Sequence, residues 1–408
     1  MWRLTCILIF GVLMALSESR AALAAQGEAE YTLALYGDSL NLPLNQSVVV
    51  PFDDKPAQQS VQAFYDQLNV GDWQPLVAAL QAFRQKHVLN DWLYYQVVRK
   101  AAQQIAPKGD NYHRYTLYKW FFLCKSGYDA TLTLENDQLR FYVRSDENVY
   151  NIPYFVRGDK QYVCLNLHDY PATKFERVKI EQIDVAVPEA TSPFSYKVTQ
   201  MPDFTPADYT AREIAFDYKG KPYYFSVMVN PQVQQVFTNY PVVDYESYFN
   251  IPLSSTTYRS LIPLLKKNVE GISDKDGVDF LMRFTRNAFL YQEDEVTFGK
   301  EKRMSPEQTL LHEYSDCDDR AALFFFLVKE IYDRPMIVLL YPTHVTIAVH
   351  FPESGTRNAI TYKGRKYAVC EPTPQPEDLP IGQLSAALKN VPYEVAYEYN
   401  PYPQQVSE

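Results

Sequence analysis

Apolar residues along this chain recur with two different periods, which separate helical stretches from extended ones. Alternating apolar positions in residues 31–51 indicate a strand-like segment. In residues 61–105 apolar side chains return every three or four positions, so two or three helices are expected there, and residues 115–123 continue helical. Residues 130–166 consist of short apolar runs separated by turn-forming pairs such as Asn136-Asp137, which predicts strands. Together these segments predict an α+β unit.

In the rest of the chain the spacing of apolar residues again changes, here from extended to helical. Residues 174–253 are expected to form successive strands, with Gly220 in a turn and prolines between the others. Helical spacing resumes at Tyr258, and a polar loop is expected over residues 292–307. The predicted fold class is therefore α+β. The expected parts are a leader (1–25), an N-terminal α+β domain (26–173), a β-rich linker domain (174–253) and a C-terminal domain (254–408).

The first 25 residues have the three parts of an export signal. Arg3 supplies a positive charge, residues 4–16 are apolar, and Ala22-Leu23-Ala24 offers small residues for cleavage. The apolar run is too short for a membrane span, which needs about 20 residues. The mature chain is therefore expected to be periplasmic or secreted and not to span a membrane. An uncleaved membrane anchor is the alternative.

The composition excludes some classes of protein and partner. Apolar residues make up 47% of the chain and charged residues 22%, which is typical of a folded globular protein. The formal net charge is −10 and no run is rich in Lys or Arg, whereas nucleic-acid binding needs clustered cations. We therefore expect no nucleic acid as a partner.

Four cysteines remain once the leader is removed: Cys124, Cys164, Cys317 and Cys370. An even number in an exported chain permits disulfides, for example between Cys124 and Cys164, but the wide spacing is not that of a disulfide scaffold. No CxxC pair suggests zinc or a redox dithiol, so neither a metal nor a cofactor is expected. A metal site formed by Cys317, His344 and His350 is a weaker alternative.

The segment around Cys317 predicts a reactive thiol. Ser315 or Asp316 can cap the apolar helix that follows, which places Cys317 at or beside its first position. Free backbone amides at a helix start stabilise a thiolate and lower the pKa of the thiol. Asp318 and Asp319 oppose that effect, so the thiolate also needs a cationic partner, and histidine is the usual one.

His344 and Glu371 are the expected partners of the thiol. His344 follows a Pro-Thr turn and begins a buried strand, and Glu371 stands at the end of the next strand. Its carboxylate can accept a hydrogen bond from Nδ1 of the imidazole, which is the third role in a catalytic triad. Tyr314 or His312 can assist the backbone amide of Cys317 in stabilising an oxyanion. Cys370 is expected to point into the core, since strand side chains alternate.

Three motifs in order carry a family resemblance: Ser315-Asp316-Cys317-Asp318-Asp319-Arg320, Tyr341-Pro342-Thr343-His344 and Glu371-Pro372-Thr373. Residues 284–382 thereby resemble the transglutaminase-like superfamily, and within it uncharacterised exported bacterial proteins. The resemblance implies a papain-like core in a thiol domain at residues 254–408. It also implies that Cys317 is the nucleophile, His344 the base and Glu371 the orienting acid. Glu371 stands where this family usually has Asp.

These observations predict an exported cysteine-dependent enzyme that transfers an acyl group from a peptide or protein substrate. Hydrolysis of a peptide or amide bond is expected rather than cross-linking, because water is always present and nothing specifies a second amine. The alternative from another class is a catalytically inactive transglutaminase-like module for binding or assembly in the cell envelope.

A similarity between two short segments also suggests an internal repeat. Phe121-Phe122-Leu123-Cys124-Lys125 is similar to Phe325-Phe326-Leu327-Val328-Lys329. Aligning the two lysines places His113 where Cys317 stands, and residues 165–167 near the position of Glu371. The N-terminal domain is therefore expected to be a degenerate copy of the thiol domain, and chance similarity of two helix-to-strand junctions is the alternative.

Overall fold

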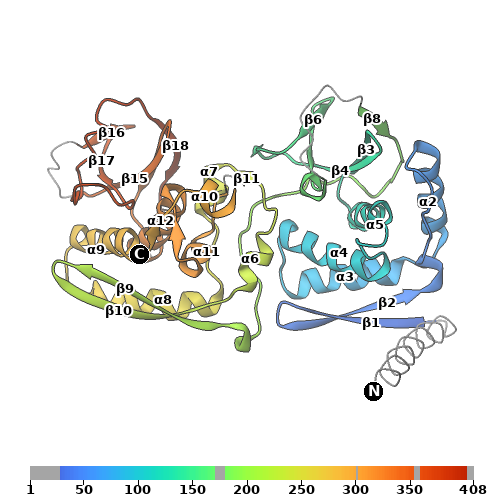
Figure 1. Cartoon of the computed structure of the whole chain (residues 1–408), viewed down its shortest axis with the longest axis horizontal. Coiled ribbons are helices and arrows are strands. Elements are labelled where there is room, and N and C mark those ends of the chain that lie inside the picture. Colours follow the sequence, from blue (N-terminus) through green and yellow to red (C-terminus); the bar gives the residue numbers. More distant parts are fainter. Residues whose placement is uncertain (1–27, 171–179, 300–301, 353–358, 402–408) are drawn as a thin grey trace, which may run out of the picture. The chain divides into compact units, whose positions relative to one another are not determined.

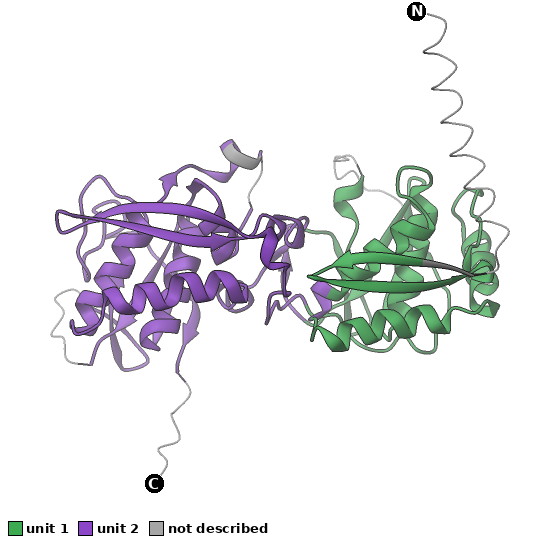
Figure 2. Cartoon of the chain, turned by 90° about the horizontal axis from the view of Figure 1, so that it is seen from below, with its two compact units in different colours: residues 1–89, 94–146, 152–195 green, residues 90–93, 147–151, 196–408 purple. Residues whose placement is uncertain are grey.

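The computed structural model describes residues 28–170, 180–299, 302–352 and 359–401. The expected export signal lies outside these residues. Contacts divide the chain into two compact units (Figure 2). Unit 1 comprises residues 1–89, 94–146 and 152–195, and unit 2 comprises residues 90–93, 147–151 and 196–408. The expected linker domain (174–253) is shared between the units, and its status as a separate domain stays a prediction.

Unit 1 begins with a hairpin and four helices. The hairpin and the helices are β1 (Glu28–Leu35), β2 (Asp38–Asn45), α2 (Gln58–Val70), α3 (Gln74–Lys86), α4 (Asp91–Ile105) and α5 (Tyr112–Lys125). Helix α5 is buried from Tyr115 to Lys125, and most of these residues are apolar or aromatic. It packs on β3 and β4 of the sheet that follows, and this contact forms the core of the unit (Figure 1).

The sheet of unit 1 has five antiparallel strands in the order β6-β7-β4-β3-β8. The strands are β3 (Ala130–Glu135), β4 (Gln138–Arg144), β6 (Tyr154–Arg157), β7 (Lys160–Cys164) and β8 (Ile180–Ile183). Asn136 and Asp137 form the turn between β3 and β4 with φ values of 48° and 65°. A left-handed backbone suits Asn and Asp, so the turn predicted from the sequence forms at these residues.

Unit 2 contains a second hairpin, several helices and a second five-stranded sheet. Its hairpin and helices are β9 (Thr210–Tyr218), β10 (Lys221–Val229), α6 (Gln232–Val236), α7 (Tyr245–Phe249), α8 (Ser255–Asn268), α9 (Asp274–Asn287), α10 (Asp294–Phe298), α11 (Pro306–Leu311) and α12 (Cys317–Tyr332). Two short strands, β12 (Leu290–Tyr291) and β13 (Tyr314–Ser315), pair in parallel just before α12. Strand β11 (Val242–Val243) pairs with β5 (Val149–Tyr150).

The sheet of unit 2 is antiparallel in the order β16-β17-β15-β14-β18. Its strands are β14 (Met336–Tyr341), β15 (His344–His350), β16 (Ile360–Tyr362), β17 (Arg365–Cys370) and β18 (Glu394–Tyr399). Helix α12 packs on β15 and against α9 (Figure 1). The core between helix and sheet is aliphatic and aromatic, and the middle of α12 is fully buried.

The two units share part of their order of elements, although α2 follows the hairpin in unit 1 and α6, β11 and α7 follow it in unit 2. Each has a hairpin whose second strand packs on a helix (β2 on α3, β10 on α8), then a further helix, a buried central helix and a five-stranded sheet. Counted along the chain, the strands of both sheets follow the same spatial order. The units differ just before the central helix: residues 106–111 separate α4 from α5, whereas residues 288–316 separate α9 from α12.

The structure confirms the α+β class in its general form: the described residues are 36% helical and 27% strand, with two curled antiparallel sheets. The loop expected at residues 292–307 is only partly a loop, because it contains α10 and the start of α11. Acidic residues in the first turn and Gly299 in the left-handed region at the C-cap favour a short helix there. Within the described ranges no helix is both long and apolar enough to cross a membrane.

Candidate active site

The start of α12 is built from a cap made of carboxylates. Asp316 is the N-cap residue, and its Oδ1 accepts hydrogen bonds from the backbone N–H groups of Asp318 (3.1 Å) and Asp319 (3.2 Å). The Asp319 side chain accepts in return from the N–H of Asp316 (3.4 Å), which completes a capping box. Cys317 is therefore the first helical residue, and its side chain is half-buried.

Asp319 and Arg320 connect the start of α12 to neighbouring segments through hydrogen bonds. Asp319 is fully buried, and its Oδ1 accepts from the N–H of Met304 (2.7 Å). Burial and the charges of Asp316 and Asp294 raise the pKa of Asp319 well above its ordinary value. Arg320 is also buried and donates to the carbonyl oxygens of Arg286 and Phe289, both at 2.8 Å. Both residues fix loops around α12.

His344 and Glu371 lie on neighbouring strands of the sheet and contact each other. His344 begins β15, Glu371 directly follows β17, and Nε2 of His344 lies 2.8 Å from Oε2 of Glu371. The ring nitrogen involved is Nε2 rather than the expected Nδ1. Because Cys370 pairs with Ile347, the next residue, Glu371, falls opposite a position two residues after His344 on β15. From there its carboxylate contacts Nε2 of the His344 ring. Nδ1 of His344 does not take part in this contact.

Glu371 is buried although it stands at the end of a strand. Its side chain is 1% exposed, and Oε1 accepts from the N–H of Thr373 (2.9 Å). Nε of Arg286 donates to the backbone oxygen of Glu371 (3.0 Å). Arg286 reaches this oxygen from α9, a contact between residues far apart in sequence, so no local pattern indicated the burial. Replacing Glu371 with alanine would therefore disturb folding as well as the histidine.

The thiol of Cys317 lies beside the start of β15. The backbone N–H of Val345 is close enough to the thiol to donate a hydrogen bond to it, and Val345 directly follows His344. The thiol itself is 3.5 Å from Oδ1 of Asp318. The packing of α12 on β15 therefore brings the helix start, and Cys317 with it, to the strand end that carries His344.

The charges around the thiol oppose its ionisation, contrary to the expectation of a stabilised thiolate. Burial first, and then the carboxylates of Asp318 and Asp316, raise the pKa of Cys317, and the Val345 amide only partly offsets them. Burial alone would lower the pKa of His344, but its hydrogen bond to Glu371 and the nearby carboxylates raise it above the ordinary value. These surroundings favour the thiol form of Cys317 over the thiolate.

Tyr314 and His312, the two oxyanion candidates, lie just before the helix. Tyr314 belongs to β13, is 36% exposed and pairs with Leu290 of β12. His312 ends α11, and its Nε2 lies 3.0 Å from the side-chain nitrogen of Gln234. An oxyanion role for either residue stays a prediction.

Tyr291 is a site residue that the sequence did not indicate. The parallel pairing of β12 with β13 sets Tyr291 opposite Ser315, and the guanidinium of Arg320 lies 5.9 Å from the centre of its ring. Burial and the proximity of Cys317 and Asp316 raise the pKa of Tyr291 to about 12. The phenol is therefore protonated at neutral pH and can donate a hydrogen bond near the thiol. Strands β12 and β13 contribute only two residues each, which is too short for a periodic pattern in the sequence. The pairing could therefore not be predicted from the sequence.

The other described cysteines have a structural role. Cys124, Cys164 and Cys370 are fully buried, and all four described cysteines are free thiols, so Cys124 and Cys164 are not joined. Cys370 points into the core, as strand alternation predicted. His350 interacts through Nδ1 with the carbonyl oxygen of Lys366 (2.9 Å). Over the part of the chain that the structure describes, no three His, Cys, Asp or Glu side chains cluster as metal ligands.

Comparison of the chain with models of protein families finds no match, and comparison with curated proteins finds no significant relative.

We expect iodoacetamide to modify Cys317 faster than the three buried cysteines, with a rate that keeps rising above pH 9. The thiolate is the reactive form, and burial with Asp318 and Asp316 keeps the pKa of Cys317 above its ordinary value. Asp318→Asn removes one of these charges and should speed modification at pH 8 severalfold, whereas Glu330→Gln at the far end of α12 should not. Mass spectrometry of peptides after timed labelling measures the rates. A rate that is already at its maximum at pH 6 would contradict this electrostatic account.

Proposed function

We propose that unit 2 is a cysteine-dependent acyl-transfer enzyme that hydrolyses a peptide or amide bond. The observation that carries the proposal is the 2.8 Å contact between His344 and Glu371, at the end of the sheet on which the Cys317 helix packs. A nucleophile, a base and a buried acid that orients the base are the parts this reaction needs. The expected substrate is a peptide or protein.

In the proposed reaction, Nδ1 of His344 removes the thiol proton as the sulfur of Cys317 attacks the carbonyl carbon of the substrate. The carbon–nitrogen bond then breaks, and the departing amine takes the proton from His344. Water attacks the resulting thioester with His344 again as base, which releases the acid and restores the thiol. Glu371 holds the ring and stabilises its protonated form.

Negative charge on the substrate oxygen needs hydrogen-bond donors during this reaction. The backbone N–H of Cys317, at the free end of α12, is one donor. The phenol of Tyr291 is a second, because it is protonated at neutral pH and lies near the thiol. Tyr314 and His312 are the alternatives expected from the sequence.

The transglutaminase-like arrangement and the degenerate copy are part of the same proposal. A cysteine at the start of a central helix, followed by an antiparallel sheet with His and an acid on neighbouring strands, agrees with the papain-like core implied by the motifs. The identical strand order of unit 1 supports a second copy. Matching the first residues of α5 and α12 puts Tyr112, rather than His113, in the place of Cys317, so this copy lacks the thiol.

Export to the periplasm or the exterior belongs to the proposal too, since it depends on residues 1–25, which lie outside the described residues. A non-catalytic module for binding or assembly is the second candidate. The observation that favours it is the raised pKa of the half-buried Cys317 thiol, which leaves little thiolate at neutral pH.

A peptide library followed by mass spectrometry tests the proposal. Wild-type protein is expected to cleave a subset of peptides, and Cys317→Ala and His344→Ala are expected to cleave none. His350→Ala, on the same strand but pointing to a backbone carbonyl, should retain activity. Cleavage that persists in Cys317→Ala would disprove the thiol mechanism. Peptides that bind to wild type and Cys317→Ala alike without being cleaved would favour the binding module.

A further inference from the structure

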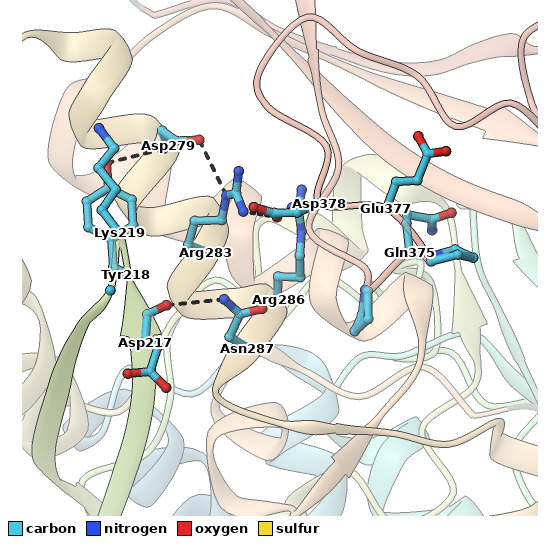
Figure 3. Close-up of a pocket in the computed structure, with 13 residues that line it drawn as sticks. Asp217, Tyr218, Lys219, Asp279, Arg283, Arg286, Asn287, Gln375, Glu377 and Asp378 are labelled. Atoms are coloured by element: carbon cyan, nitrogen blue, oxygen red, sulfur yellow. Dashed lines mark hydrogen bonds and ion pairs between the residues drawn. The ribbon is translucent and has the colours of Figure 1, made fainter.

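A cavity of about 500 Å³ lies in unit 2, between the β9–β10 turn, the C-terminal half of α9 and residues 374–378 (Figure 3). Two arginines of α9, Arg283 and Arg286, line it one helical turn apart. Their side chains are only 14% and 4% exposed. A cavity of this size, with buried charged groups on one wall, has the dimensions of a small-ligand site.

Arg286 is held in place by several acceptors. Its Nε donates to the backbone oxygen of Glu371 (3.0 Å), and its Nη2 donates to that of Leu379 (3.1 Å). Burial and then the charge of Arg283 lower the pKa of Arg286 to about 10. The two guanidinium groups therefore concentrate positive charge on the wall of the cavity, and Arg286 remains protonated at neutral pH.

A single loop carboxylate is shared by the two arginines. Asp378 pairs with Arg286 at 2.9 Å and also with Arg283, and its own side chain is 71% exposed (Figure 3). It comes from a loop with prolines at positions 374, 376 and 380 rather than from a helix or strand. The two buried arginines are thus paired with a carboxylate whose own side chain is mostly exposed to solvent.

Arg283 retains unused hydrogen-bonding capacity. Its buried Nε has no hydrogen-bond partner among the described residues, and the carboxylate of Asp279 is 3.6 Å away. Asp279 in turn accepts from the hydroxyl of Tyr218 (3.2 Å). A buried donor without an acceptor is costly, so an acceptor arriving in the cavity would gain this hydrogen bond.

We propose that this cavity binds a ligand with a free carboxylate, as at the C-terminus of a peptide, and that Asp378 occupies the place of that carboxylate in the unliganded protein. Guanidinium forks bind carboxylates through paired N–H···O bonds. The incoming carboxylate displaces Asp378, contacts both arginines and accepts from Nε of Arg283, while the rest of the ligand fills the cavity. The proposal does not depend on the thiol chemistry.

Competition by Asp378 should lower the affinity of the protein for a free carboxylate, and this effect can be measured. A tethered carboxylate acts at an effective concentration in the millimolar range, so a free carboxylate binds the wild-type protein weakly. Asp378→Asn removes the competing charge without changing the size of the side chain. The variant should therefore bind a free carboxylate at least about tenfold more tightly than the wild type does.

Isothermal titration of the full chain with N-acetylalanine tests this, with N-acetylalanine amide as the matched probe that lacks the carboxylate. We expect Asp378→Asn to bind the acid but not the amide. Adding Arg283→Gln to Asp378→Asn should abolish binding, whereas adding Lys275→Gln, an exposed cation at the start of α9, should not. Thermal unfolding verifies that each variant is folded, and Asp378→Ala replaces Asp378→Asn if the latter is not.

Three outcomes would overturn the assignment. Equal binding of acid and amide would show that the carboxylate is not recognised. No binding to a folded Asp378→Asn or Asp378→Ala variant would make the arginine pair purely a support for the loop. Tighter binding of inorganic phosphate than of N-acetylalanine would assign the arginines to a phosphate instead.

Discussion

Replacing Glu371 with glutamine is expected to lower the pKa of His344 below its ordinary value and to slow the proposed hydrolysis by about a thousandfold. Burial, the largest influence on the pKa of His344, lowers it, and the hydrogen bond and charge of Glu371 are the main influences that raise it. Glutamine keeps the size of the side chain and can still accept from the N–H of Thr373, so the fold should persist. NMR titration of the His344 ring and kinetics on a cleaved peptide measure the two effects.

Glu371→Asp is the matched control, because it keeps the charge and shortens the side chain by one methylene group. The pKa of His344 should then stay closer to the wild-type value than in Glu371→Gln, and aspartate is the residue that the family pattern usually has. An unchanged His344 titration in Glu371→Gln would remove Glu371 from the site. An altered titration with unchanged hydrolysis would keep the contact but deny it a catalytic role.

Replacing Lys119 of unit 1 with methionine is expected to increase the free energy of unfolding at pH 7 by about 1–3 kcal/mol, the cost of a buried polar group without a hydrogen-bond partner. Lys119 is fully buried in α5, and its amine has no hydrogen-bond partner among the described residues. The nearest carboxylate, Asp169, is 3.7 Å away. Burial lowers the pKa of Lys119 to about 7, only partly opposed by Asp169. Asp169 keeps Lys108 and the Tyr112 hydroxyl (2.7 Å) after the change.

The pH dependence follows from the direction of this shift. Between about pH 7 and the ordinary lysine value of about 10.4, the unfolded chain holds the proton of Lys119 and the folded chain does not. The cost of burying the amine is therefore complete below pH 7 and falls as the pH rises. Lys119→Met should remove this rise in stability.

Hydrogen exchange in peptides of α5 at pH 7 and pH 9.5 measures this local stability. Lys125→Met is the control, because Lys125 is equally buried but pairs with Glu189 at 3.0 Å, so no gain is expected there. A loss of stability in Lys119→Met at pH 7 would show that the pair with Asp169 outweighs the cost of burial.

The sequence predicted those parts of the site that depend on neighbouring residues. The cap at Asp316 and the apolar run after it placed Cys317 at a helix start, and the turn before His344 placed that residue at the start of a strand. The same local signals predicted the Asn136-Asp137 turn.

Parts that depend on distant segments could not be predicted in this way. The burial of Glu371 requires Arg286 of α9, and the place of Tyr291 requires pairing with β13 across residues 292–313. The direction of the Cys317 pKa depends on how deeply the thiol is buried, which a capping pattern does not specify. Strands β9 and β10 were expected from the sequence. The identical strand order of the two five-stranded sheets depends on long-range pairing, which the sequence pattern does not show.

The segment between α9 and α12 has a consequence for how such a site can change in evolution. Residues 288–316 contribute Tyr291, Tyr314 and, through Met304, a backbone contact to Asp319. Unit 1 reaches the same strand order with only residues 106–111 in that position, so a central helix and sheet of this kind can be assembled without the segment. Selection can therefore lengthen, shorten or replace this segment and so change the surroundings of the Cys317 thiol, while the helix and sheet that fold the unit stay under separate constraint.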